Sequence, residues 1–311
     1  MPVISNSNLA DNNQEQSFAN SVDNTTTYVQ ENSNVSSSTN GLSEAEMQDP
    51  NKIAVEVSDH ESPLIILFGP PASGKTMTLI RLTRYLQSVG YIIAPIKTFR
   101  PSVDTNYSDI CDNFDAMINS NNAAASTNRV SFMLVEVQNK NGRVLCQILE
   151  APGEHYFKPD EPNKDFPAYV NTIIHSQNRK VWAIMIEPGW KDGTDRRNYV
   201  TKITHLKTNM HKTDHVVFIY NKIDKTNYVR NIGDVNKSAA IKKAKEEYPN
   251  IFTPFRNENP LTKFISEYRC EFVPFQTGTY TKTQDGGVTY QEGPKEYCAK
   301  LWNVLLKKIR G

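Results

Sequence analysis

LIILFGPPASGKT, residues 64–76, joins five apolar residues to a loop that matches the phosphate-binding pattern G-x-x-x-x-G-K-[ST] at every fixed position. The apolar residues predict a buried strand, and residues 77–88 after the loop have a helical pattern. Backbone N–H groups of such a loop, together with the N-terminus of the helix, replace the water around phosphate oxygens. The stretch therefore predicts that the chain binds a nucleotide, without indicating which one.

Individual side chains of this loop have separate predicted roles. Gly69 and Gly74 allow the backbone to approach the phosphates closely. Lys75 can reach the outer phosphates as a point charge, and the hydroxyl of Thr76 can bind Mg²⁺. The alternative is an ordinary glycine–proline turn that happens to precede Lys-Thr, and the flanking strand and helix argue against it.

The overall composition narrows the class of protein. The 311 residues include 35 Lys and Arg against 34 Asp and Glu, so nothing indicates a nucleic-acid-binding or membrane-surface protein. The four cysteines lack metal-ligand spacing, and we expect reduced thiols in a cytoplasmic protein. The start, MPVISNSNLADNN, has no basic end followed by an apolar stretch, so no signal peptide is expected, and no apolar run is long enough to span a bilayer.

Two regions of different composition divide the chain. Residues 1–61 are rich in Asn, Ser, Thr, Gln, Asp and Glu, and Lys52 is their only basic residue apart from His60. Such a segment buries too little apolar surface to offset its ordering entropy, so we predict a disordered polar tail. A tail that folds on a partner, or an autoinhibitory arm, is the alternative. We expect residues 62–311 to form one folded domain.

Strand and helix patterns alternate within that domain. Apolar runs predict strands at 64–68, 91–96, 130–137, 143–149, 181–186, 215–220 and 271–275. Helical patterns lie at 74–88, 193–210, 236–247, 260–268 and 294–309. Asn141-Gly142 between two of the strands predicts an antiparallel hairpin. The prediction is a three-layer α/β fold of the P-loop NTPase type, with a mostly parallel sheet, helices on both faces and one antiparallel edge strand.

The tetrapeptide NKID, residues 221–224, directly follows the strand at 215–220 and would lie at the carboxyl ends of the sheet. Guanine presents an N1–H and a 2-amino group side by side, and one carboxylate can accept both, whereas adenine has no such pair. Asp224 is the candidate for that carboxylate. Asn221 can bridge the base edge and nearby loops, and the stem of Lys222 can lie along the face of the ring.

The motif order GPPASGKT, a hairpin ending in EAPGEH (residues 150–155), then NKID resembles that of Ras-like and translation-factor-type GTPases over about residues 62–311. The resemblance implies GTP or GDP as ligand, with Mg²⁺. It also implies that Gly153 donates its backbone N–H to the γ-phosphate and that Glu150, one methylene longer than the usual Asp, reaches Mg²⁺ through water. Thr127 would close over the metal and the γ-phosphate, with Ser126 and Thr98 as weaker alternatives.

The resemblance also implies where catalysis would occur. After the glycine of its third motif the family carries a Gln or His that positions the attacking water, and here that place holds Glu154, with His155 next. Glu154 can orient water but adds charge beside the γ-phosphate. His155 would substitute after a small shift, and simple packing or capping is its alternative role. Thr277 would lie in the turn that contacts the base.

Several functions are compatible with these motifs. The first is a GTP-binding switch protein with slow hydrolysis and an unidentified protein effector or regulator. The second is a scaffold that binds GTP without hydrolysing it, suggested by Glu150 and Glu154. A P-loop kinase lacks a clear arginine-rich lid here, and an ATPase motor lacks a strand ending in paired acids. The expected catalytic residues are Lys75, Glu154 and His155, and the expected metal ligands are Thr76, Thr127 and Glu150. Nucleotide contacts are expected from Gly69, Ala72, Ser73, Gly74, Lys75, Thr76, Met77, Gly153, Asn221, Lys222, Asp224 and Thr277.

Overall fold

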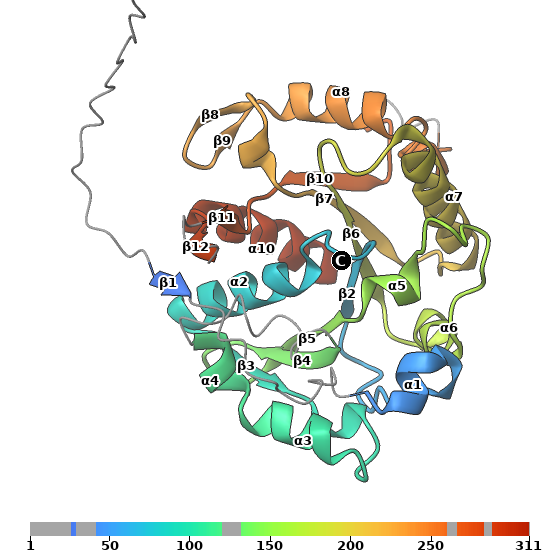
Figure 1. Cartoon of the computed structure of the whole chain (residues 1–311), viewed down its shortest axis with the longest axis vertical. Coiled ribbons are helices and arrows are strands. Elements are labelled where there is room, and N and C mark those ends of the chain that lie inside the picture. Colours follow the sequence, from blue (N-terminus) through green and yellow to red (C-terminus); the bar gives the residue numbers. More distant parts are fainter. Residues whose placement is uncertain (1–25, 29–41, 120–131, 260–265, 283–287, 311) are drawn as a thin grey trace, which may run out of the picture.

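The central sheet organises the molecule. The structure, a computed structural model, describes residues 26–28, 42–119, 132–259, 266–282 and 288–310 (Figure 1). Within these residues seven strands form one sheet in the order β10-β7-β6-β2-β5-β4-β3. Their bounds are β2 (Leu64–Phe68), β3 (Ile92–Pro95), β4 (Met133–Gln138), β5 (Val144–Glu150), β6 (Lys180–Ile186), β7 (His215–Tyr220) and β10 (Cys270–Pro274).

Strand β2 lies at the centre of this sheet, parallel to β5 on one side and to β6 on the other. Every residue of β2 and of β6 is buried. Their continuous apolar runs are what a parallel strand requires when helices cover both faces of the sheet. The parallel pairing continues through β7 to β10, so the carboxyl ends of β2, β5, β6, β7 and β10 meet at one edge.

The antiparallel part of the sheet lies toward its β3 end. Strand β4 pairs antiparallel with β5 across the Asn141-Gly142 turn, where Gly142 has φ of +77°, as the sequence predicts. Strand β3 then pairs antiparallel with β4 and forms the outer edge. Pro95 ends β3, where the missing N–H is tolerated because, among the described residues, one side of the strand has no neighbouring strand. The predicted α/β fold with a mostly parallel sheet is confirmed.

Helices cover both faces of the sheet. Figure 1 shows α2 and α10 side by side on one face and α5, α6 and α7 on the other. On the second face the ring of Phe68 contacts Tyr156 at 4.8 Å and Tyr199 at 6.3 Å between centroids. None of the described helices is both long enough and apolar enough to cross a membrane. The bounds are α1 (Glu44–Gln48), α2 (Lys75–Ser88), α3 (Thr105–Asp112), α4 (Phe114–Asn119), α5 (Gly153–Tyr156), α6 (Ala168–His175), α7 (Gly193–Asn209), α8 (Lys237–Glu247) and α10 (Lys295–Arg310).

Two small hairpins were not predicted. β8 (Val229–Asn231) pairs with β9 (Asp234–Val235), and β11 (Gly278–Lys282) pairs with β12 (Val288–Glu292), against which β1 (Thr26–Tyr28) also lies. These strands are short and largely polar, so they lack the apolar run that marks the central strands. Glu292 of β12 forms ion pairs with Arg81 and Arg84 of α2, which hold the second hairpin against the domain. The predicted helix at 260–268 falls largely outside the described residues.

Residues 42–57, here called the N-terminal strap, lie within the predicted polar tail and make defined contacts with the rest of the domain. Arg100 is only 3% exposed, and its guanidinium donates to Glu46 Oε1 and to the carbonyl of Ala54, both at 2.7 Å. Asn51 Oδ1 accepts from the backbone N–H of Ala168 at 3.1 Å, at the start of α6. A few spaced apolar residues and one buried arginine are enough to dock the strap, and average composition hides them. The apolar residues buried by the strap are Leu42, Ile53 and Val57.

Candidate functional site

The loop between β2 and α2 is locked to the segment that follows β7. Gly74 has φ of +89°, and a Cβ on it would lie 2.3 Å from Asn221 Nδ2. Only glycine satisfies both the backbone conformation and this close approach. The side chain of Asn221 is fully buried, and its Nδ2 donates to the carbonyl of Ser73 at 3.0 Å. The NKID segment and the phosphate loop, 148 residues apart in sequence, therefore form one unit.

Gly153, the first residue of α5, lies directly against the phosphate loop. A Cβ on Gly153 would lie 2.3 Å from the backbone nitrogen of Pro71, 2.5 Å from the carbonyl carbon of Pro70 and 2.7 Å from Lys75 Nζ. Parallel pairing of β2 with β5 causes this contact, because it brings their carboxyl ends together. The three motifs thus converge on one end of the sheet.

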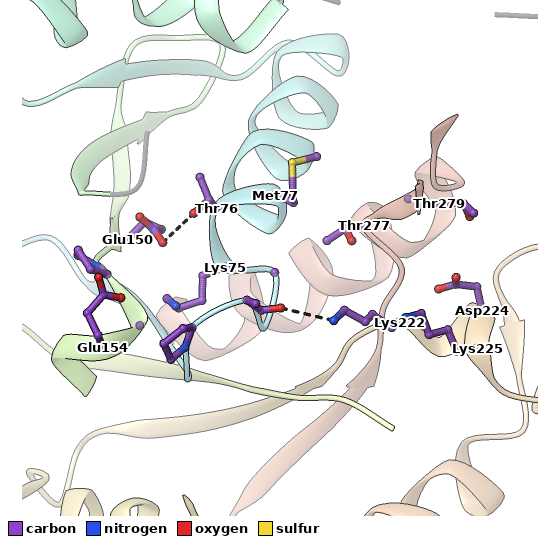
Figure 2. Close-up of a pocket in the computed structure, with 16 residues that line it drawn as sticks. Lys75, Thr76, Met77, Glu150, Glu154, Lys222, Asp224, Lys225, Thr277 and Thr279 are labelled. Atoms are coloured by element: carbon purple, nitrogen blue, oxygen red, sulfur yellow. Dashed lines mark hydrogen bonds between the residues drawn. The ribbon is translucent and has the colours of Figure 1, made fainter. Parts of the chain in front are cut away.

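One cavity of about 610 Å³ connects the three motifs (Figure 2). Figure 2 shows Glu150 and Glu154 at one end, Asp224 with Lys225 at the other, and Lys75 between them. A single ligand can therefore touch both Lys75 and Asp224. The cavity is lined by these predicted site residues: Ala72, Gly74, Lys75, Thr76, Met77, Glu150, Gly153, Glu154, Lys222, Asp224 and Thr277.

Lys75 and Glu150 are buried ionisable groups at one end of the cavity. Burial lowers the pKa of the Lys75 ammonium, and the carboxylates of Glu150 and Glu154 act in the opposite direction. Lys75 Nζ donates to the carbonyl of Pro70 at 3.2 Å. Burial also raises the pKa of the Glu150 carboxyl well above its ordinary value, and the charge of Lys75 offsets part of this effect. A charged ligand at this end of the cavity would supply the opposite charges that burial withholds from the two groups.

The carboxyl group of Glu150 is only partly satisfied. Its Oε1 accepts a hydrogen bond from the hydroxyl of Thr76 at 3.0 Å, while its buried Oε2 has no hydrogen-bond partner in the described part of the chain. A carboxylate oxygen and a threonine hydroxyl are ligands that Mg²⁺ accepts, and it takes its remaining ligands from phosphates and water. The described residues contain no cluster of three or more His, Cys, Asp or Glu that could hold a metal ion.

The other end of the cavity carries the exposed carboxylate of Asp224, which lies in a single turn after β7. Beside it are Thr277, at the end of the segment after β10, and Thr279 of β11. The carbonyl of Thr277 accepts from the hydroxyl of Tyr290 at 2.8 Å, so the unpredicted β11–β12 hairpin holds this wall in place. An exposed carboxylate at an open rim can accept two parallel N–H donors.

His155 lies outside this cavity. Its Nδ1 shares a hydrogen bond with the hydroxyl of Tyr169 at 2.8 Å, and it lines a second cavity of about 480 Å³ between the N-terminal strap and the residues after Gly153. Burial lowers the pKa of the imidazole to about 4. Glu154, in contrast, is exposed and lines both cavities. Of the two predicted water-positioning residues, only Glu154 faces the space beside Lys75.

The titration of His155 gives a first testable prediction. In the unfolded chain the imidazole binds its proton near pH 6.5, whereas in the folded chain it does so only near pH 4. Between these values the unfolded state holds the extra proton, so stability falls as the pH falls. We expect the free energy of unfolding of the His155→Asn variant to depend less on pH in this range, with a slope smaller by about 1.4 kcal/mol per pH unit. Urea unfolding of both proteins from pH 4 to 6.5 measures it, and equal slopes would contradict the assignment.

The remaining predicted residues have other positions. Gly69, Ser73 and Asn221 lie behind the loop and shape it, and Thr127 falls outside the described residues. The hydroxyl of Thr98 is 3.0 Å from that of Ser58 and does not line the cavity. The sequence analysis missed five lining residues. Their signal was adjacency, because each lies within two positions of a chosen motif residue: they are Pro71, Pro152, Lys225, Gly278 and Thr279.

Comparison with known proteins finds similar solved structures but no similar sequence. The sequence matches no protein-family model and no curated protein. A structure from Plasmodium falciparum that carries the name nucleolar GTP-binding protein 1 aligns over 82% of this chain and 91% of its own, with 14% identity and a TM-score of 0.38. The GTP-bound GTPase-like domain of Ski7 from S. cerevisiae aligns over 81% of this chain and 51% of its own, with 15% identity and a TM-score of 0.38.

A third solved structure is translation elongation factor SelB from Methanococcus maripaludis. It aligns over 81% of this chain and 34% of its own, with 10% identity and a TM-score of 0.31. This chain therefore spans about a third of the SelB structure and about half of the Ski7 structure. Identities and TM-scores this low assign no function to the chain.

Proposed function

We propose that the chain is a guanine-nucleotide-binding switch protein that binds GTP and GDP with Mg²⁺ and hydrolyses GTP slowly. The supporting observation is that Lys75 and Asp224 line the same cavity. A nucleoside triphosphate needs both ends of this cavity. Its phosphates need cationic groups and N–H donors, and its base needs a polar group. A carboxylate at the base end favours guanine, because adenine would leave it unpaired.

The residues at the phosphate end divide the work of binding and catalysis. Lys75 would exchange its hydrogen bond to Pro70 for the outer phosphate oxygens, while the N-terminus of α2 and the N–H of Gly153 donate to the same group. Thr76 and Glu150 fit as protein ligands of Mg²⁺, which would supply positive charge to neutralise the phosphates as the bond breaks. Glu154 would orient the attacking water in line with the bond that breaks.

Removal of the Thr76 hydroxyl tests the metal site. We expect Thr76→Ala to weaken binding of a non-hydrolysable GTP analogue roughly tenfold in Mg²⁺ and to leave binding in EDTA unchanged, because the hydroxyl acts through the metal. Isothermal titration calorimetry measures both values. Thr172→Ala, which removes an exposed hydroxyl on α6, is the matched control. Equal weakening with and without Mg²⁺ would assign Thr76 to direct phosphate contact instead.

The proposal as a whole is tested by calorimetry with GDP, a non-hydrolysable GTP analogue and ATP, each with and without Mg²⁺. We expect both guanine nucleotides to bind at least roughly 100-fold more tightly than ATP, because rejection by an unpaired carboxylate is strong. Equal affinity for ATP and the GTP analogue would refute the proposal and favour a kinase or an ATPase.

A second candidate is a scaffold that binds GTP without hydrolysing it. The position of His155 favours it, since this side chain is turned to Tyr169 and away from the cavity. Single-turnover measurement with labelled GTP separates the two functions. GDP formed within hours excludes the scaffold, whereas intact GTP after a day excludes the slow GTPase.

The switch proposal includes a partner and a cellular setting. A protein effector or regulator would read the segments near the γ-phosphate, which order and release in nucleotide switches. We also propose a cytoplasmic setting, where thiols stay reduced. The four cysteines are free, and three of them are buried.

A further inference from the structure

Glu187 is a buried carboxylate immediately after β6, beside the NKID segment. It is 7% exposed, and its Oε2 lies 2.5 Å from Lys222 Nζ. Its backbone is fixed by Tyr248, whose hydroxyl donates to the carbonyl of Glu187 at 2.8 Å and accepts from its N–H at 3.4 Å. Glu187 does not line the cavity, so it can act on a ligand there only through its charge or through a neighbour such as Lys222.

Lys222 links three neighbouring strand ends. Its Nζ contacts Glu187 after β6 and also donates to the carbonyl of Ala72 in the phosphate loop at 3.4 Å, a bond visible in Figure 2. Its backbone has φ of +55°, and the preceding Asn221 holds the next carbonyl of the loop. A lysine stem has several freely rotating bonds, and ordering it costs up to about 2 kcal/mol. Two anchors on the ammonium hold the stem in one conformation before a ligand arrives.

We propose that Glu187 is a positioning residue for the nucleotide base: it clamps Lys222 so that the aliphatic stem forms a preset wall of the base site. This inference rests on the proposed function, that the cavity takes a guanine nucleotide. A preset wall loses less conformational entropy on binding, which tightens affinity. Because Glu187 already neutralises the ammonium, Lys222 contributes shape to the base end more than charge to the phosphates.

A simple charge effect of Glu187 would have the opposite sign. Its carboxylate repels phosphates, so if charge alone mattered, Glu187→Gln would strengthen the binding of every phosphate ligand. Positioning predicts weaker binding of ligands that carry the base and no weakening of inorganic pyrophosphate, which has no base to contact the stem. The two explanations therefore differ in direction as well as in size.

The test compares GDP and inorganic pyrophosphate on the full chain, each by competition with a fluorescent GDP analogue. For Glu187→Gln we expect GDP to bind roughly tenfold more weakly and pyrophosphate to bind no more weakly than to wild type. Glu247→Gln is the matched control: this nearby carboxylate accepts from the N–H of Gly189 and pairs with Lys243 without contacting Lys222. It should change neither affinity.

Two further variants make the result decisive. In a Lys222→Met background, Glu187→Gln should add nothing to the loss of GDP affinity. If Glu187→Gln lowers the melting temperature, Glu187→Asp, whose carboxylate falls one methylene short, should still weaken GDP and spare pyrophosphate. Unchanged or tighter GDP binding, or equal weakening of both ligands, overturns the inference. A wild-type chain that does not bind GDP overturns the proposed function itself, so the two failures are distinguishable.

Discussion

Asp224→Asn is expected to weaken GDP binding roughly 100-fold and to make the site prefer xanthosine diphosphate. The carboxylate of Asp224 has only acceptors, which suit the two adjacent donors of guanine. An asparagine amide has one acceptor and one donor, so its NH₂ would face the 2-amino group of guanine, donor against donor. Xanthine carries a carbonyl at that place and presents one donor and one acceptor, which match the amide.

Calorimetry with the two diphosphates measures this exchange of preference. Asp234→Asn, which removes an exposed carboxylate of β9 that does not line the cavity, is the control and should leave GDP binding unchanged. A generally unfolded variant would lose both ligands, whereas the expected variant gains one. If Asp224→Asn keeps the affinity of the wild type for GDP, this carboxylate does not read the base, and the proposed guanine specificity fails.

Gly153→Ala is expected to reduce nucleotide affinity by roughly 100-fold or more and to destabilise the fold by about 1–3 kcal/mol. The added Cβ would lie 2.3 Å from the backbone nitrogen of Pro71, and backbone moves less readily than the end of a side chain. Relief of the overlap must displace either the phosphate loop or the start of α5. Both segments border the position that the γ-phosphate would occupy.

The matched control is Gly193→Ala, because Gly193 also begins a helix, α7. A Cβ there meets only Arg197 Nη1, at 3.4 Å. Alanine is intrinsically better than glycine in a helix by about 1 kcal/mol, so the control should be neutral or stabilising in thermal unfolding. A lower melting temperature for Gly153→Ala beside an equal or higher one for Gly193→Ala would support the contact with the loop. Similar melting temperatures and nucleotide affinities for the two variants would contradict it.

Much of the fold was predictable because some residues face strict local constraints. The apolar run of β2 could only be buried, and a glycine–lysine loop after such a strand has few other uses. The position of Asp224 at the carboxyl ends of the sheet was predictable, because polar residues that follow buried parallel strands gather at one edge. The same rule applied to the strand at 181–186 would have indicated Glu187, which directly follows it.

Other features depend on contacts between distant segments, which local patterns do not encode. The orientation of His155 is set by the hydroxyl of Tyr169, 14 residues further on. The β11–β12 hairpin is held by ion pairs to α2, and its own strands have no apolar period. The N-terminal strap depends on Arg100, and nothing in the composition of the tail indicates that a buried arginine elsewhere binds it.

The grip of Arg100 on the N-terminal strap bears on how the protein should be shortened for experiments. A fragment that starts at residue 62, where composition changes, would remove the Glu46 carboxylate and the Ala54 carbonyl that this guanidinium holds. Of the ion pairs that Arg100 makes with described side chains, only that with Asp104 would remain. The fragment would also expose the apolar surface beneath Leu42 and Ile53, and exposed apolar surface of this kind promotes aggregation. Proteins expressed for biochemical experiments should therefore begin at or before Leu42.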